Sequence, residues 1–264
     1  MKIAFIGGGN MGAAMVTGIL DNGVMPARNI CMSDIDVAKL EEFGKRGVVI
    51  TNDNQEAADF ADYIFLAVKP QQYEEAFLAF DKTEGKVVIT MAPGVSIDDI
   101  SKRLGGVKVI RIMPNTPAKV REGATAMCCG EGISEYECKF VKELLASFGE
   151  VYCIEESKMD DIVALLGSSP AYAYMLVEAM AEHAAKCGID YDLAVEIAAQ
   201  VMKGSSKMIL ETKKSPQALR EEVCSQGGTT IKAVEALQKA KFAETIGKAM
   251  DACTARAKEL AKKG

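Results

Sequence analysis

The sequence contains one histidine, His183, and none of its cysteines forms a C-x-x-C pair. Zinc sites need several histidine or cysteine ligands at close spacing, so we predict no metal site. We expect the thiols to be reduced, and mostly buried as small hydrophobic side chains. The cysteines are Cys31, Cys128, Cys129, Cys138, Cys153, Cys187, Cys224 and Cys253.

The chain also lacks an excess of basic residues and any long uncharged apolar run. Its net charge of −6 disfavours broad contact with nucleic acid or an anionic membrane. No stretch has the length of a membrane span without charges, and Met1 and Lys2 lead directly into a strand pattern with no targeting segment. We therefore expect a cytoplasmic protein whose partners are small molecules.

Up to about residue 155, short β-rich apolar runs alternate with helical patterns. This alternation is typical of an α/β protein with a parallel sheet and crossover helices. We predict an N-terminal Rossmann-type doubly wound sheet in residues 1–157. Its expected strands are 2–7, 30–33, 48–51, 63–68, 87–91, 108–113, 124–129 and 150–154.

Beyond about residue 160, alanine, methionine and leucine recur at helical spacing, which predicts an all-α domain in residues 158–264. We expect one helix over 171–187, closed by Gly188, and a second from a cap at Asp190 to about Thr212. Ser215 and Pro216 then begin a short helix.

The helix over 171–187 is apolar on most of its faces, with a thin polar stripe of Glu178, Glu182 and Lys186. Such a helix must be covered, and about a hundred residues of helix offer little to cover it. We therefore predict dimerisation through this domain.

Gly7, Gly9 and Gly12 form a G-x-G-x-x-G motif directly after the first strand. The glycines permit a tight turn, close approach of a pyrophosphate and tight helix packing. The phosphates would lie on the amides near Asn10 and Met11, at the positive end of the helix. This segment predicts a dinucleotide cofactor.

Asp34 ends the second strand about twenty residues beyond Gly12, where a carboxylate accepts hydrogen bonds from the adenosine ribose. This favours NADH over NADPH, because the carboxylate would repel a 2′-phosphate. Ser33 is the only nearby hydroxyl suited to a phosphate. Asp34 is equally explained as a turn residue or helix cap, so the choice of cofactor stays open.

Further cofactor contacts are expected where later strands end. Ala67, Val68, Lys69 and Pro70 leave the fourth strand at its carboxyl end, where ligands bind in open α/β sheets. Lys69 would contact a ribose or remain a solvated loop charge. Asn115 is the best polar candidate in the following loops, although ordinary turns have similar composition.

The segment 223–230 separates two helical patterns and contains Ser225, Gly227, Gly228, Thr229 and Thr230. Its hydroxyls and the free amides of the next helix would receive a carboxylate. The alternative is a plain loop with Thr229 or Thr230 as N-cap.

The chain also lacks an obvious acid for carbonyl reduction. Such reactions need a proton donor of suitable pKa, and His183 lies mid-helix beside Glu182, where we expect a surface residue. A cyclic imine can arrive already protonated, and hydroxyl groups then suffice to orient it. The segment 223–230 suits that substrate class.

With these residues in view, the chain resembles the pyrroline-5-carboxylate reductase family over its whole length. The resemblance runs through FIGGGNMG, AVKPQ, APGVS, MPNTPA, SSPAY and SQGGTTIKAVEAL, in the family's order. It implies a Rossmann domain and a helical domain that intertwines with a second subunit, with dimers often forming decamers. It also implies that the nicotinamide contacts residues 67–70 and that the substrate lies against residues 225–230, near the dimer interface.

The resemblance also implies roles for single residues. Thr230 would hydrogen-bond the ring nitrogen, Ser225 and the amides of Gly228 and Thr229 would hold the carboxylate, and Asn54 would lie near the adenosine. The chain departs from the family at four positions, which leaves turnover and substrate range open. These are Val163, Leu166, Ser169 and Gln226.

Two alternatives remain. The β-hydroxyacid dehydrogenases share the two-domain plan but carry a catalytic lysine early in the interdomain helix, and residues 164–185 contain no lysine. A catalytically idle dinucleotide sensor would also fit the glycine motif, although the segment 225–230 disfavours it.

Overall fold

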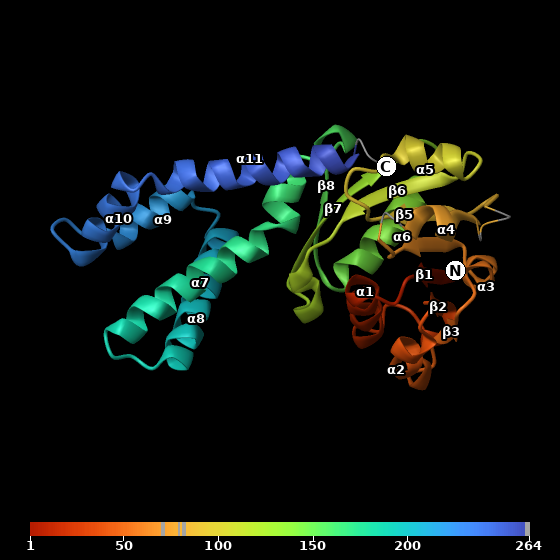
Figure 1. The fold of residues 1–264 in the computed structure, drawn as a ribbon, viewed down its shortest axis with the longest axis horizontal. Coiled ribbons are helices and arrows are strands. Elements are labelled where there is room, and N and C mark those ends of the chain that lie inside the picture. Colours follow the sequence, from red (N-terminus) through yellow and green to blue (C-terminus); the bar gives the residue numbers. More distant parts are fainter. Residues whose placement is uncertain (70–71, 79, 81–82, 262–264) are drawn as a thin grey trace. The chain divides into compact units, whose positions relative to one another are not determined.

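The computed structural model describes residues 1–69, 72–78, 80 and 83–261. The chain divides into two compact units, Met1–Ser168 with Cys253–Gly264, and Ser169–Ala252 (Figure 1). The second unit is thus an insertion between two parts of the first. The two units are described separately below.

Within the described residues, the first unit contains an eight-stranded sheet of order β3-β2-β1-β4-β5-β6-β7-β8. The chain starts in the middle of the sheet, moves out to β3 and returns through β4, which confirms the doubly wound fold. Only the pair of β6 and β7 is antiparallel. The strands are β1 (Ile3–Ile6), β2 (Ile30–Ser33), β3 (Val49–Thr51), β4 (Tyr63–Leu66), β5 (Val87–Thr90), β6 (Lys108–Met113), β7 (Gly123–Cys129) and β8 (Gly149–Cys153).

The central strands are buried on both faces. Every residue of β1, β2, β4 and β5 is buried, as expected for parallel strands between two helical layers. Side chains of alternating residues form two core clusters, in one of which Phe5 stacks on Phe65 at 4.5 Å. The helices of this unit are α1 (Asn10–Asp21), α2 (Glu41–Lys45), α3 (Asn54–Phe60), α4 (Tyr73–Leu78), α5 (Ile97–Arg103) and α6 (Glu135–Ala146).

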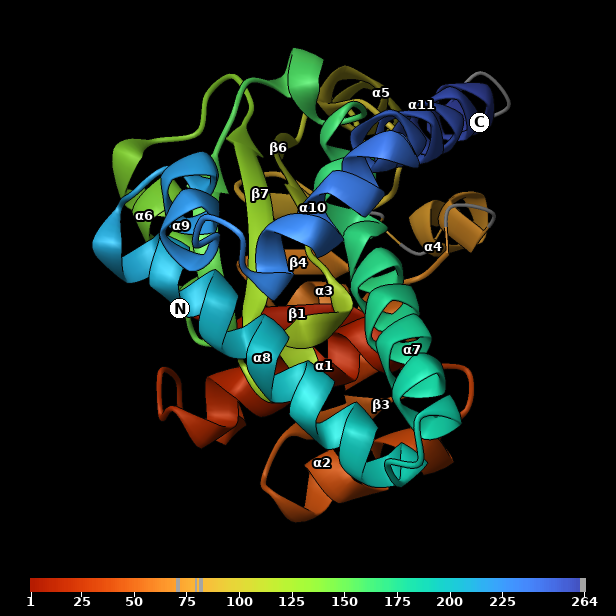
Figure 2. The same cartoon turned by 90° about the vertical axis from the view of Figure 1, so that its left-hand side faces the viewer.

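The second unit is helical throughout its described residues, as predicted. In it, α7 (Ser169–Lys186) packs beside α8 (Tyr191–Thr212) as a hairpin (Figure 2). Gly188 turns the chain at φ +88°, and the side chain of Asp190 caps α8 by accepting from Leu193 N. Ser215 caps α9 (Pro216–Val223), which is followed by α10 (Thr229–Lys239) and α11 (Phe242–Ala261).

The division of the chain differs from the boundary predicted between residues 157 and 158. The first unit extends to Ser168 because Met159 and Leu166 pack against Met113 and Ala126, on β6 and β7. The first unit also includes the end of α11, where Ala257 is buried. The change to helical composition near residue 158 thus precedes the end of this packing, and the predicted boundary stays a prediction.

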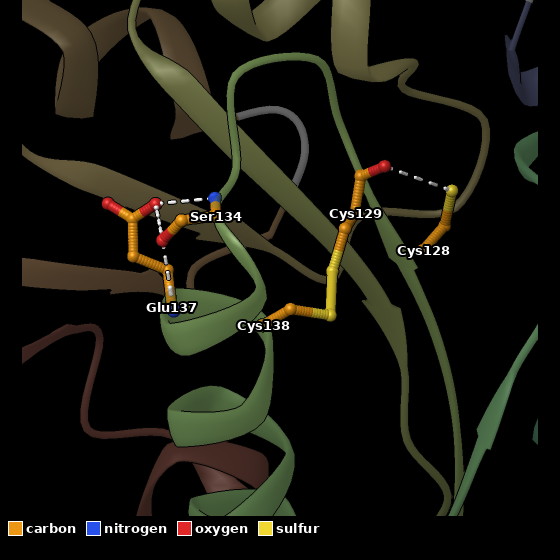
Figure 3. The surroundings of a disulfide bond; sticks show 5 residues. All are labelled: Cys128, Cys129, Ser134, Glu137 and Cys138. Carbon is orange, nitrogen blue, oxygen red and sulfur yellow. Dashed lines mark hydrogen bonds between the residues drawn. A yellow bond between two sulfur atoms is a disulfide. The ribbon is translucent and has the colours of Figure 1, made fainter.

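The expectation that all cysteines are reduced is wrong for one pair. Cys129, at the end of β7, forms a disulfide with Cys138 on α6 (Figure 3). A capping box of Ser134 and Glu137 fixes the start of α6 and so places Cys138 opposite the strand end. Of the six free cysteines, only Cys31 is buried, so the expectation of mostly buried thiols is also wrong.

Among the described residues, the structure has no helix with the length and apolar character needed to cross a membrane.

Candidate functional site

The glycine motif forms a sharp turn between β1 and α1. Gly7 has φ +105°, a conformation that favours glycine, and its amide donates to Ser33 O at 2.8 Å. A Cβ atom on Gly12 would lie 2.5 Å from Gly7 O, whereas a Cβ on Gly9 would meet nothing within 4 Å. The turn therefore needs Gly7 and Gly12 for its own geometry and leaves open space beside Gly9.

Helix α1 presents free amides at this turn. Gly9 is its N-cap, without a side-chain cap among the described residues, and the helix begins at Asn10. Amides in the first turn of a helix have no partner within the helix, and the dipole there is positive. The amides of Asn10 and Met11 are thus suited to a phosphate.

Asp34 has two structural partners at the turn. Its Oδ2 accepts from Gly8 N at 2.8 Å, and its Oδ1 accepts from Asp36 N at 3.0 Å. Lys39 Nζ lies 3.8 Å from Asp34 Oδ1 and 3.6 Å from Asp36 Oδ2. Asp34 is therefore a turn residue, as the alternative interpretation held, and it also lines the adjacent groove.

A groove of about 400 Å³ runs along the carboxyl ends of β1, β2 and β4. Ser33 Oγ donates to Asn54 Oδ1 at 2.7 Å at its edge. Pro70 lies outside the described residues, and Asn10, Met11, Gly12 and Asn115 do not line the groove. The predicted residues that line it are Gly7, Gly9, Ser33, Asp34, Asn54, Ala67, Val68 and Lys69.

Sequence reasoning missed other residues that line this groove. Ile35 lines the groove although it is apolar and 77% exposed, and its position directly after Asp34 was the available sequence signal. Gln72 Oε1 accepts from Lys69 N at 3.3 Å, an interaction without a sequence signal. The remaining residues of this kind are Asp36, Lys39, Glu75 and Ala76.

A larger hollow of about 1060 Å³ lies at the amino ends of β5 and β6, beside Lys86 and Lys108. None of the predicted site residues lines it. Ligands of open α/β sheets bind at the carboxyl ends of the strands, so the smaller groove is the functional candidate.

A buried hydrogen-bond network supports the loops after β4 and β5. Tyr73 Oη lies 3.0 Å from Thr90 Oγ1 and 3.5 Å from Leu66 O, and Thr90 Oγ1 accepts from Ala92 N at 3.4 Å. Burial raises the pKa of Tyr73 to about 12. The tyrosine is therefore neutral near pH 7, and its hydrogen bonds position the backbone at Leu66 and, through Thr90, at Ala92.

Asn115 joins two backbone segments. Its Oδ1 accepts from Ala124 N at 2.9 Å, and its Nδ2 donates to Leu166 O at 3.3 Å. The side chain is buried, so these bonds give it a structural role. Its contact with a cofactor stays a prediction.

In the second unit, the predicted substrate segment forms a turn between α9 and α10. Gly227 has φ +71°, Gly228 N donates to Ser225 O at 3.0 Å, and a Cβ on Gly228 would clash with Ser225 Oγ. Gly228 is the N-cap of α10, without a side-chain cap. The alternative that Thr229 or Thr230 caps this helix is therefore wrong, because both residues lie inside its first turn.

A Rossmann sheet with a free helix N-terminus, an acidic residue after β2 and an appended helical unit defines a nicotinamide-dependent oxidoreductase. Residues 2–94 match the family model described as NADP oxidoreductase, coenzyme F420-dependent. Residues 156–260 match the model described as pyrroline-5-carboxylate reductase dimerisation, which begins close to the predicted boundary. The chain belongs to the pyrroline-5-carboxylate reductase family.

Individual relatives support this assignment over the full length. Pyrroline-5-carboxylate reductase 3 of Danio rerio is 38% identical over 266 residues, which cover 100% of this chain and 92% of the relative. The solved structure of a pyrroline-5-carboxylate reductase from Coxiella burnetii has a TM-score of 0.91 at 37% identity and 98% coverage of both chains. The Plasmodium falciparum enzyme, solved with NADP bound, has a TM-score of 0.89 at 26% identity, covering 99% of this chain and 98% of that one.

These matches confirm the resemblance and the fold class inferred from the sequence, and they identify the helical unit as a dimerisation domain.

Proposed function

We propose that this protein reduces the cyclic imine 1-pyrroline-5-carboxylate to L-proline with NADH or NADPH, the last step of proline biosynthesis. The observation that carries the proposal is full-length similarity to enzymes of that name, together with the Ser225–Thr230 turn at a free helix N-terminus. One pair of cysteines is bonded, but the other six are free, and this majority supports our proposal of a cytoplasmic location.

The groove beside Gly9 fits a dinucleotide. The open space at Gly9 and the free amides of α1 suit a pyrophosphate. The carboxylate of Asp34 suits a ribose. When bound, the reduced nicotinamide supplies the hydride. We propose that residues 67–70 border it and that Asn54 lies near the adenosine.

We propose a preference for NADH. The carboxylates of Asp34 and Asp36 both line the groove, and Lys39 is the cation within 4 Å of them. A 2′-phosphate placed there would face two negative charges against one positive charge, which disfavours NADPH.

In the second unit, Ser225 and the amides of Gly228 and Thr229 are proposed to hold the substrate carboxylate. The amides stand at the positive end of α10, which favours an anion. Thr230, half-buried in the same helical turn, is proposed to hydrogen-bond the ring nitrogen and orient the imine carbon. A substrate that arrives protonated needs no titratable donor from the protein.

The helical unit is proposed to form a homodimer. Its α7–α8 hairpin exposes large apolar side chains, among them Tyr174, Met175, Ile197 and Val201. Such a surface on a single chain marks a protein interface. A particle mass of five dimers would reveal the decamer that the family resemblance implies.

A steady-state assay tests the reaction. With 1-pyrroline-5-carboxylate we expect oxidation of the reduced cofactor, and Thr230→Ala should lower kcat by about 10²-fold, as loss of one oriented hydrogen bond at the reacting group does. Thr230→Ser should recover much of the rate. Thr245→Ala, which removes a threonine of α11 bonded only to Lys241 O among the described contacts, is the matched control and should not change kcat.

A flat absorbance trace with both cofactors would refute the proposal. Oxidation of a β-hydroxyacid would instead indicate the related dehydrogenase class, and cofactor binding without turnover would indicate a sensor.

A further inference from the structure

Arg111 is the only charged residue among the buried side chains of the described part of the chain, with 3% exposure. It lies on β6 between Ile110 and Ile112, which are fully buried. A buried cation is costly unless it is paired. Its partners therefore indicate why the strand carries it.

Both partners come from the segment that follows β8. Arg111 Nη2 donates to Asp160 Oδ1 at 2.5 Å, and Nη1 lies 3.7 Å from Glu156 Oε1. The same oxygen of Glu156 accepts from Ile97 N at 2.6 Å, at the start of α5. Arg111 thereby holds residues 156–160 against β6 and against the loop that follows β5.

Residues 156–168 are fixed at further points within the first unit. Met159 is fully buried, Leu166 O accepts from Asn115, and Asp161 pairs with Lys258 of α11 at 2.8 Å. The segment ends at Ser168, whose Oγ lies 3.1 Å from Cys253 Sγ. The chain leaves the first unit at Ser168 and returns to it at Cys253, so this segment sets where α7 begins.

Stability alone does not explain the arginine. A well-packed apolar side chain in place of a buried ion pair is often neutral or stabilising. Unlike such a side chain, the guanidinium makes a directional hydrogen bond to Asp160, and its charge also attracts Glu156.

We propose that Arg111, through Asp160 and Glu156, is a positioning residue for hydride transfer: it fixes residues 156–168, and with them the start of the substrate-binding unit. This inference rests on the proposed function. Hydride transfer is sensitive to placement, since a shift of about 1 Å costs about 10²-fold in rate. No described residue of β6 lines the groove, so we expect the affinity for NADH without substrate to change little when Arg111 is replaced.

The test compares Arg111→Met, Arg111→Lys and Asp160→Asn with the wild-type enzyme. We expect Arg111→Met to lower kcat by about 10²-fold and to raise the primary isotope effect with NADH deuterated at the transferred position. The dissociation constant of NADH, measured by fluorescence without substrate, should not change. Arg111→Lys should recover part of kcat because it restores the charge.

Lys108→Met is the matched control, because Lys108 lies on the same strand and pairs with Glu137 at 2.9 Å. It should leave kcat and the isotope effect unchanged. If Arg111→Met does not fold, the kcat of Asp160→Asn tests the inference. This variant should fold, because the side chain of Asp160 is 31% exposed and asparagine keeps an acceptor oxygen while removing the charge.

A wild-type kcat in the folded arginine and aspartate variants would overturn the inference, as would equal losses of kcat and NADH affinity. An inactive wild-type enzyme would refute the proposed reaction instead, so the two failures are distinguishable.

Discussion

At the scale of single residues, the carboxylate of Asp34 has a structural task, and the proposed function adds recognition of the cofactor to it. It holds the amides of Gly8 and Asp36 and also lines the dinucleotide groove. Each carboxylate oxygen has two acceptor positions, so these bonds leave room for ribose hydroxyls. Changing the cofactor preference at this residue therefore also affects the glycine turn.

We predict that Asp34→Ser lowers the ratio of kcat/KM for NADH to that for NADPH by about tenfold or more, which corresponds to about 1.4 kcal/mol. It should also reduce the free energy of unfolding by about 1.5 kcal/mol, because a charged acceptor for Gly8 N is lost. Side-by-side kinetics and urea titration measure the two effects.

Asp34→Asn is the matched variant, since it keeps an acceptor for Gly8 N but removes the charge. A change in cofactor ratio with little change in stability would separate the two tasks. An unchanged ratio in both variants would contradict the role of Asp34 in selecting NADH.

At the scale of elements, the disulfide links the end of β7 to the first turns of α6. Closing a short loop restricts the unfolded chain and stabilises the fold by about 2–3 kcal/mol. We predict that Cys129→Ser lowers the free energy of unfolding by this amount under oxidising conditions, while kcat stays unchanged because neither cysteine lines the groove.

Cys153→Ser, which removes an exposed free thiol of the adjacent strand, is the control. Equal stability of Cys129→Ser and wild type without reductant would show that the bond does not form in solution. Thiol counting by mass spectrometry gives an independent measurement.

The elements also show how much of the fold can be predicted from the sequence. All the predicted strands are present, and the central ones were predictable because strands buried on both faces read as continuous apolar runs between turn residues. The glycine turn and Asp34 were predictable because their spacing follows local geometry. The disulfide was not, since it joins a strand end to a helix whose separation depends on packing.

The candidate site was likewise predictable only where local sequence patterns determine it. Residues at strand ends, such as Ser33 and Lys69, line the groove as expected, and so does Asn54, whose place only the family resemblance implied. Asn115 also follows a strand, but its amide bridges Ala124 and Leu166, which are brought together only by tertiary packing. The placement of Arg111 against Asp160 depends on the same packing and has no local pattern.

At the scale of the whole molecule, α8 exposes an apolar face that we expect to form the dimer interface. Ile197 is 51% exposed on this helix, beside the buried residues Ala194 and Ala198. We predict that Ile197→Asp shifts the protein from dimer toward monomer in light scattering after gel filtration, because a buried unpaired charge is costly.

Val120→Asp is the control, since Val120 is an aliphatic residue of the first unit with 69% exposure. It should leave the mass unchanged. A dimeric Ile197→Asp variant would show that this face of α8 is not the interface.

The return of the chain to the first unit at Cys253 has a consequence for protein synthesis. Ala257, which is buried, and Lys258, which pairs with Asp161, follow the helical insertion in the sequence and so leave the ribosome after it. The Rossmann sheet can assemble earlier, but the ion pair to Asp161 must wait. The segment leading into α7 is therefore fixed only after the whole helical insertion has been synthesised. The first unit thus completes its fold only when the second unit is already present.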